Sequence, residues 1–192
     1  MALFREHSDV SVRPATPQDE GPIAQVQLRA WRLSHGELLG EDVLAQLDED
    51  AVRRQWAQAI TAPPSPQHRV LVACAGAEVV GLAAFAPAPG GVEVLALEVD
   101  PDHQRGGHGS RLLTACVDLA REAGADHLET WVLDGDGARE QFLAGAGLGP
   151  DGTRRQLAVR PDHARSDDGV DGPEDATGTG RSVAEHRWVA DI

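Results

Sequence analysis

The chain has 192 residues, is 41% hydrophobic and carries a formal net charge of −14 at pH 7. This length favours a single domain, so we expect one domain over residues 1–192. The acidic balance argues against nonspecific nucleic-acid binding, which needs a basic face. No apolar run approaches the ~18 residues of a transmembrane helix, and the N-terminus has no signal-peptide pattern. We therefore expect a cytoplasmic protein that binds neither nucleic acid nor a membrane.

Periodicity predicts, in chain order, a strand, two helical regions, a strand hairpin, a strand, a helix, a strand, a helix and two strands. The predicted elements cover residues 10–13, 16–31, 43–60, 69–74 with 78–85, 92–99, 110–122, 127–133, 138–144, 153–159 and 182–189. Thr16 and Asp48 are expected to cap the N-terminal ends of helices, and Gly124 to follow the end of one. This order fits a mixed α/β fold with helices on both faces of the sheet.

Three further features have simple interpretations. Residues 161–182 are rich in Asp, Gly and Pro, which predicts a flexible acidic loop between two strands of one sheet. Cys74 and Cys116 lie in apolar patterns and are expected to be buried. No Cys/His cluster has zinc-ligand spacing, so no metal is expected.

The segment from residue 93 to residue 113 predicts a strand, a tight glycine-rich loop and a helix. Glycines let the backbone turn sharply, and the free amides of a helix N-terminus attract anions. Arg105 adds a positive charge, so the loop suits a phosphate or pyrophosphate. The chain has no Lys for a P-loop, and Leu112 stands where a dinucleotide fingerprint needs its third Gly. The glycines by themselves fit equally well a turn that binds nothing.

Gln104, Gly107 and Gly109 match the pattern Gln/Arg-x-x-Gly-x-Gly/Ala, and this segment resembles the signature of the GNAT N-acetyltransferases. Residues 97–101 are similar to the strand that precedes the loop in that family, and the order of elements also resembles it. The resemblance implies a GNAT fold with a central, mixed, mostly antiparallel sheet. It also implies an enzyme that moves the acetyl group of acetyl-CoA to a primary amine of a small molecule or peptide. Attack would be direct, in a ternary complex, and a homodimer would be common for the family.

By this resemblance, backbone amides of the loop hold the pyrophosphate of coenzyme A, and the preceding strand pairs with the pantetheine arm. The implied cofactor-binding residues are Leu97, Val99, Gln104, Arg105, Gly106, Gly107, His108, Gly109 and Ser110. For the loop histidines His103 and His108, exposure to solvent is the preferred interpretation and phosphate contact the alternative.

The resemblance implies a carboxylate that takes the proton of the amine, and Glu93 is the candidate. An exposed strand residue is the equal alternative for Glu93, and Glu98, on the opposite face from Leu97, is the second candidate base. Many family members carry a Tyr where Leu143 stands, and this chain has no Tyr. Without this Tyr, either water protonates the departing coenzyme A thiolate, or turnover is slow, or the chain is a CoA-binding regulatory or catalytically impaired module.

Two tryptophans are candidates for contact with the acceptor amine. Trp31 lies at the end of the first predicted helix, near the acceptor pocket of the family, and Trp131 lies on the strand beside the cofactor strand. A core role is the competing interpretation for Trp31, as it is for Trp56. The sequence leaves the acceptor open among polyamines, antibiotics, amino acids and protein N-termini.

Overall fold

A computed structural model describes residues 10–159 and 181–192 of the chain. The strands are β1 (Val10–Pro14), β2 (Arg69–Ala75), β3 (Glu78–Ala88), β4 (Gly91–Val99), β5 (His127–Leu133), β6 (Gly149–Val159) and β7 (Arg181–Asp191). The α-helices are α1 (Glu20–Ser34), α2 (Gly36–Leu39), α3 (Glu41–Ala45), α4 (Glu49–Thr61), α5 (His108–Glu122) and α6 (Gly137–Gly145), and 3-10 turns cover Pro17–Asp19 and Pro101–His103.

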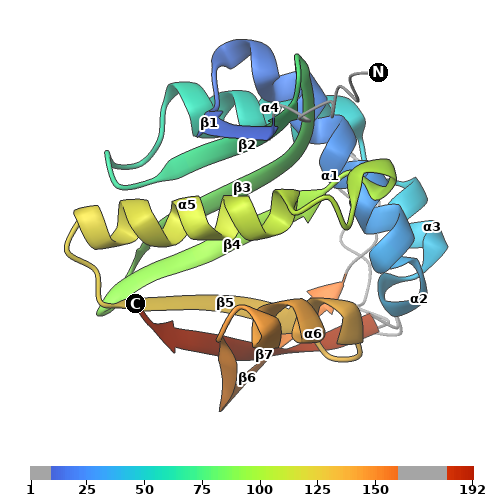
Figure 1. Ribbon diagram of the computed structural model, residues 1–192. Coiled ribbons are helices and arrows are strands. Elements are labelled where there is room, and N and C mark those ends of the chain that lie inside the picture. Colours follow the sequence, from blue (N-terminus) through green and yellow to red (C-terminus); the bar gives the residue numbers. More distant parts are fainter. Residues whose placement is uncertain (1–9, 160–180) are drawn as a thin grey trace, which may run out of the picture.

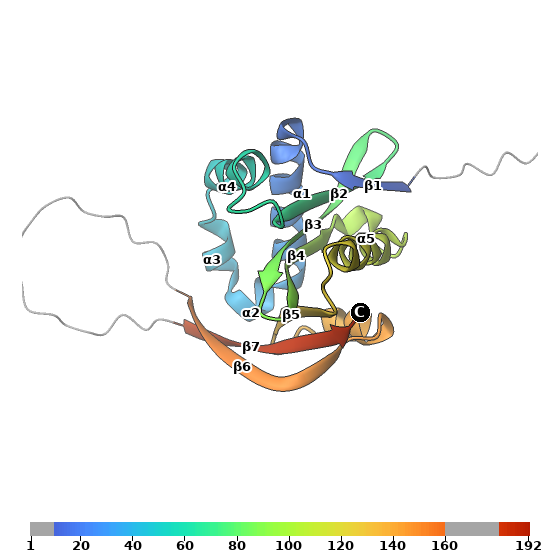
Figure 2. The same cartoon turned by 90° about the vertical axis from the view of Figure 1, so that its left-hand side faces the viewer.

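The strands form one seven-stranded sheet in the order β1-β2-β3-β4-β5-β7-β6. Neighbouring strands are antiparallel except β4 and β5, which are parallel. Helices α1 and α4 cover one face, and α5 and α6 lie on the other (Figures 1 and 2). The predicted mixed, mostly antiparallel sheet with helices on both faces is confirmed.

The sheet opens at its centre into a wedge between β4 and β5. The two strands pair only over residues 92–94 of β4 and 128–130 of β5, and Figure 1 shows them diverging beyond that point. The Thr130 hydroxyl donates a hydrogen bond of 2.9 Å to the Val94 carbonyl at the closed end of the wedge. Leu95 is left out of the pairing with β3, as in a β-bulge, and is 57% exposed. Beyond Val94, β4 therefore presents a backbone edge that β5 does not cover.

Each face of the sheet has its own hydrophobic core. Leu112 and Cys116 of α5 belong to the core that also contains Leu128 of β5. Ile23 of α1 and Trp56 of α4 belong to the core on the other face. Burial raises the pKa of the Cys116 thiol to about 12, so this cysteine is a packed apolar group at neutral pH. Together with the burial of the other cysteine, Cys74, this confirms both predictions of buried thiols.

The helix boundaries differ from the sequence prediction in the second helical region. A turn divides the predicted region 43–60 into α3 and α4. Helix α2, which was not predicted, precedes them and is separated from α3 by Gly40, whose φ is +98°. Asp48 caps α4 as predicted, since its carboxylate accepts a hydrogen bond of 2.9 Å from the Asp50 amide. Most of the predicted loop 161–182 lies outside the described residues, and β7 already begins at Arg181.

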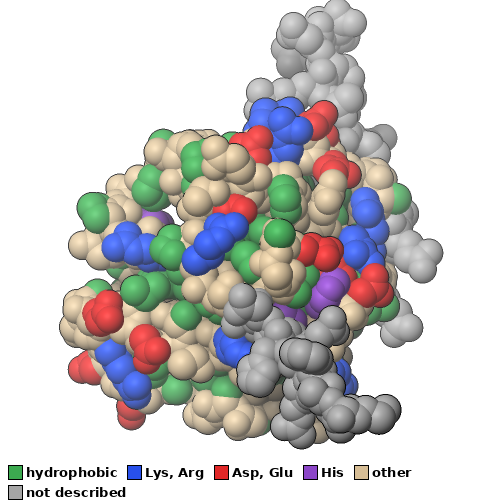
Figure 3. Space-filling view, turned by 45° about the horizontal axis from the view of Figure 1, so that its top comes forward, with side chains coloured by type: hydrophobic (Ala, Val, Ile, Leu, Met, Phe, Trp, Pro, Cys, Tyr) green, Lys and Arg blue, Asp and Glu red, His purple; other side chains and the backbone are tan. Residues whose placement is uncertain are grey.

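The surface carries acidic and basic side chains side by side. On the face in Figure 3, Arg side chains lie in separate places, several of them next to acidic side chains. Within residues 10–159 and 181–192, no helix combines the length and the apolar character needed to cross a membrane. The same residues contain no group of three or more His, Cys, Asp or Glu side chains arranged to hold a metal ion.

Candidate functional site

A cavity of about 520 Å³ lies at the open end of the wedge. Its walls come from the end of β4, the glycine-rich loop, the first turn of α5, helix α6 and the C-terminal part of α1. All the predicted cofactor-binding residues except Gly106 line it, namely Leu97, Val99, Gln104, Arg105, Gly107, His108, Gly109 and Ser110. The cavity therefore joins the loop to the uncovered edge of β4.

The loop has the backbone conformation of an anion site. Arg105 has a φ of +64° and Gly107 one of +81°, and Gly107 immediately precedes α5. A Cβ atom on Gly106 would approach the His108 ring to 3.1 Å, and one on Gly107 would approach Arg111 to 3.0 Å. The amides of the first turn of α5 have no carbonyl of their own helix to bind and carry the positive end of its dipole. The loop thus forms a close-fitting cradle whose free amides could hold a phosphate group.

Charged side chains anchor this loop to α1. The Asp100 carboxylate is buried, accepts a hydrogen bond of 3.0 Å from the Asp102 amide and lies 2.6 Å from the Arg29 guanidinium. Arg29 also contacts the carboxylate of Asp102 at 2.7 Å. Two carboxylates sharing one guanidinium hold the turn before the glycines in a fixed position.

His108 is buried, so the preferred interpretation of a solvent-exposed histidine is wrong at this position. Its ring faces that of His103 edge-on at 6.3 Å between centroids. Burial, followed by the charges of His103 and Arg111, lowers the pKa of His108. Among the described residues, its buried Nδ1 has no hydrogen-bond partner.

The edge of β4 has free backbone groups that point into the wedge. The Gln104 side-chain amide donates a hydrogen bond of 3.4 Å to the Val99 carbonyl, which marks the direction of that carbonyl. Because backbone groups alternate in direction along a strand, Leu97 presents its amide and carbonyl on the same edge. An extended ligand lying along this edge could add to the sheet as a short strand.

The Glu98 side chain points to the face of the sheet opposite that of Leu97, as its position in the strand predicted. Its carboxylate accepts hydrogen bonds from the Trp31 indole at 3.4 Å and from the Arg139 guanidinium at 3.2 Å. These partners belong to α1 and α6, and Glu98 and Arg139 both line the cavity. Arg139 was not among the predicted site residues, although it lies four residues before Leu143 and so on the same side of α6.

A second contact links α6 to the end of α1. The Asp136 carboxylate caps α6 by accepting a hydrogen bond of 3.0 Å from the Arg139 amide, and it lies 3.5 Å from Nε2 of His35. Burial acts to raise the pKa of Asp136, but the hydrogen bonds from His35 and from the Arg139 amide, with the charges of both residues, outweigh it and lower the pKa. Sequence periodicity gave no signal for this contact, since the two residues are far apart in the chain.

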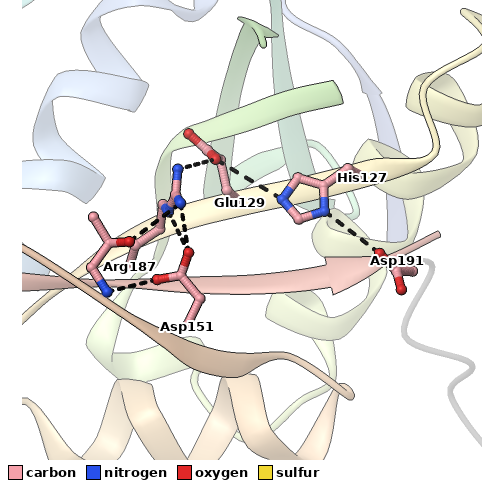
Figure 4. Close-up of polar contacts among 6 residues, drawn as sticks. His127, Glu129, Asp151, Arg187 and Asp191 are labelled. Atoms are coloured by element: carbon pink, nitrogen blue, oxygen red, sulfur yellow. Dashed lines mark hydrogen bonds and ion pairs between the residues drawn. The ribbon is translucent and has the colours of Figure 1, made fainter. Parts of the chain in front are cut away.

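Glu93 lies at the closed end of the wedge, beside Glu129 in the parallel register of β4 and β5. Burial raises its pKa; Arg155 and Arg187 oppose the rise, and Glu129 and Glu185 add to it. Arg187 contacts Glu129 at 3.0 Å and Asp151 at 2.6 Å (Figure 4). For Glu93 no ion pair occurs among the described residues. Its carboxyl group is therefore more basic than an ordinary glutamate.

The two candidate tryptophans and Leu143 occupy different surroundings. Trp31 contacts Glu98 as described, and Trp131 lies partly buried on β5 with the Arg155 guanidinium 4.1 Å from its ring centre. Leu143 is buried in the core beneath α6. Its aliphatic side chain cannot donate a proton.

The comparisons with known proteins agree with this architecture. Residues 28–147 match the model of the acetyltransferase (GNAT) family. Because this match covers more than half of the chain, the protein belongs to the GNAT acetyltransferase family. A search of curated proteins finds no significant match.

Solved structures resemble the whole chain at low sequence identity. A PaiA N-acetyltransferase from Thermoplasma acidophilum, in complex with coenzyme A, is 13% identical with a TM-score of 0.72, covering 96% of this chain and 99% of its own. The ribosomal-protein-S18-alanine N-acetyltransferase from Escherichia coli is 16% identical, with a TM-score of 0.62 and coverages of 95% and 94%. YncA, a putative acetyltransferase from Salmonella typhimurium with acetyl-CoA, is 19% identical, with a TM-score of 0.59 and coverages of 95% and 93%. At these identities the likeness shows a shared fold.

Proposed function

We propose that this protein transfers the acetyl group of acetyl-CoA to a primary amine of a small molecule or peptide. The observation that carries the proposal is the cavity that joins the cradle around Gly107 to the uncovered edge of β4. Acetyl-CoA supplies the acetyl group as an activated thioester. The amides after Gly107 would hold its pyrophosphate, and the backbone of Leu97 and Val99 would pair with its pantetheine arm. Two of the structures with this fold contain coenzyme A or acetyl-CoA.

Glu93 is the proposed proton acceptor. A lysine-like amine has a pKa of about 10.4 and must lose a proton before it can attack. The raised pKa of Glu93 suits a base that works near neutral pH. Glu93 lies beside Glu129 at the closed end of the wedge, and an acceptor amine bound there would pass its proton to it.

Trp131 and Trp31 are the proposed contacts for the acceptor. Trp131 projects from the face of β5 that carries Glu129, because alternate residues of a strand point to one side. Trp31 approaches from α1 through its contact with Glu98. The amine would then lie between α1 and the sheet. We propose that attack occurs within a ternary complex, in which the thioester and the amine would enter from different sides of the wedge.

The proposal is tested first by ligand binding with two matched variants. Gly107 and Gly90 have φ values of +81° and +82°, so Gly107→Asp and Gly90→Asp impose similar backbone strain. Aspartate enters this conformation more readily than most residues, and only Gly107→Asp puts a negative charge in the cradle. At about a hundred times Kd, coenzyme A should stabilise the wild type by about 2.7 kcal/mol in a thermal-shift experiment.

We expect acetyl-CoA and coenzyme A, but not ATP or NAD, to stabilise the wild type and Gly90→Asp. Gly107→Asp should fold and lose this effect. If coenzyme A stabilises none of these proteins, the cofactor assignment is wrong. A panel of primary amines, assayed for release of free coenzyme A, then tests turnover. Binding without transfer to any amine would favour the alternative of a CoA-binding module that does not catalyse the reaction.

A further inference from the structure

Arg139 carries a positive charge to the wall of the cavity, where it pairs with Glu98 of β4. It lines the cavity together with Leu97 and Phe142, and its side chain is 18% exposed. Only its Nη1 has a hydrogen bond among the described residues, to Glu98, whose side chain is 11% exposed. Its buried Nε has no partner among the same residues. The guanidinium therefore retains donors that the described part of the protein does not use.

A purely structural role explains this pair poorly. Burying two charges carries a desolvation penalty that their attraction often fails to offset, and an apolar pair would serve packing as well. Helix α6 is also held at its start by Asp136, which caps it and contacts His35 at 3.5 Å. A cationic side chain that lines a reaction cavity can stabilise negative charge that develops during a reaction.

The proposed reaction develops that charge on sulfur. The amine nitrogen attacks the thioester carbonyl carbon, a C–N bond forms and the C–S bond breaks. The electron pair of the C–S bond leaves with sulfur as a thiolate, and the amine proton passes through water to Glu93. A thiol has a pKa of about 8.5, so a modest electrostatic stabilisation is enough to hold the product as thiolate. No Tyr occurs in the chain, and Arg105, the other arginine that lines the cavity, belongs to the glycine-rich loop.

We propose that Arg139 is a catalytic residue that stabilises the departing thiolate, and that Glu98 is a positioning residue that holds its guanidinium in the wedge. This inference rests on the proposed acetyl transfer. The cavity extends from the loop to Arg139, and the wedge closes shortly beyond, at Val94. A ligand anchored by its pyrophosphate at Gly107 and lying along Leu97 would bring its reactive end beside this guanidinium.

The first experiment measures the ionisation of the coenzyme A thiol in the binary complex, without turnover. The ultraviolet absorbance of the thiolate is followed against pH, and the same complex with desulfo-coenzyme A is subtracted to remove the protein thiols. A guanidinium close to the sulfur should lower the thiol pKa by about one unit or more relative to free coenzyme A. Arg139→Gln should abolish this shift, and Arg139→Lys should keep most of it.

Arg154→Gln is the matched control, because Arg154 also forms an ion pair, at 3.0 Å with Asp134, but lies on the exposed surface of β6. It should leave the thiol pKa as in the wild type. In turnover, Arg139→Gln should lower kcat at least about tenfold with little change in the KM for acetyl-CoA, because the lost interaction forms only as charge develops. Arg139→Lys should recover part of that loss.

The outcomes separate the two proposals. A wild type that neither binds coenzyme A nor transfers acetyl groups contradicts the proposed function itself. A wild type that does both, with the same thiol pKa and kcat as Arg139→Gln, overturns the role of Arg139 alone. Loss of coenzyme A binding in a folded Arg139→Gln also overturns it, since the residue would then bind ground-state cofactor. If Arg139→Gln fails to fold, the thiol pKa with Arg139→Lys decides: a value equal to that of free coenzyme A overturns the inference.

Discussion

Two glutamates on the same strand, Glu93 and Glu98, have opposite surroundings. At Glu93 the strands β4 and β5 are still paired, other carboxylates are near, and burial raises the pKa of its carboxyl group. At Glu98 the strands have separated, and the carboxylate accepts hydrogen bonds from Arg139 and Trp31. Because the sheet opens between these two positions, the Glu93 carboxylate is free to take up a proton, whereas the Glu98 carboxylate is paired with the Arg139 guanidinium.

The sharpest test of this contrast is Glu93→Gln, which removes the proposed base and keeps the shape of the side chain. We expect kcat to fall by about 10²–10⁴-fold, the usual contribution of a general base. The KM for acetyl-CoA should change little, because the cradle at Gly107 is untouched. Steady-state kinetics with an accepted amine provide the measurement. Glu20→Gln is the control, because Glu20 is paired with Arg53 at 3.1 Å at the start of α1, outside the cavity lining.

The pH profile sharpens the same prediction. A base must be ionised to act, so kcat/KM should rise with pH through the pKa of Glu93 in the free enzyme. Because that pKa is raised, the acidic limb should lie above the ordinary glutamate value of about 4.3. Glu93→Gln should abolish this limb. A limb that persists unchanged in the variant would assign the proton acceptor to another group.

Combining substitutions tests whether the two glutamates act independently. Glu98→Gln should lower kcat by about tenfold, or about 1.4 kcal/mol, because it loosens Arg139 without removing it. The five-residue separation along a strand corresponds to about 16 Å. Changes in activation free energy at such distant sites usually add within about 0.5 kcal/mol, so the double variant should show the sum of both effects. A double variant no slower than Glu93→Gln would instead mean that the two carboxylates share one proton path.

The sequence predicted the framework and the loop because both depend on local patterns. Apolar strand patterns marked every strand, and helical periodicity marked the longer helices. The spacing of Gln104, Gly107 and Gly109 marked the turn into α5. The position of Glu98 on the face opposite Leu97 also followed from strand parity. These features involve neighbours in the chain, so one sequence is enough to predict them.

The charged contacts across the wedge could not be predicted in this way. Arg139 and Glu98 are separated by 41 positions, and their meeting depends on where β5 leaves β4. The burial of His108 likewise depends on packing around the loop, whereas the sequence pattern predicted that this histidine is exposed to solvent. A short helix such as α6 presents side chains in several directions, and only the assembled sheet determines which of them faces the wedge. Long-range geometry, rather than residue type, decides these contacts.

Asp136, which lines the cavity together with Glu98, should show the smallest effect, and that effect is on stability. Asp136→Ala removes the cap of α6, worth about 1 kcal/mol of unfolding free energy in urea denaturation. Since the folded-state pKa of Asp136 is lowered, its ionised form adds stability above the unfolded pKa of about 3.9. That contribution is lost as the pH falls through the lower, folded value. Asp48→Ala removes the solvent-exposed cap of α4 and controls for loss of a cap alone. If both variants lose the same stability at every pH, the contact with His35 contributes nothing beyond capping.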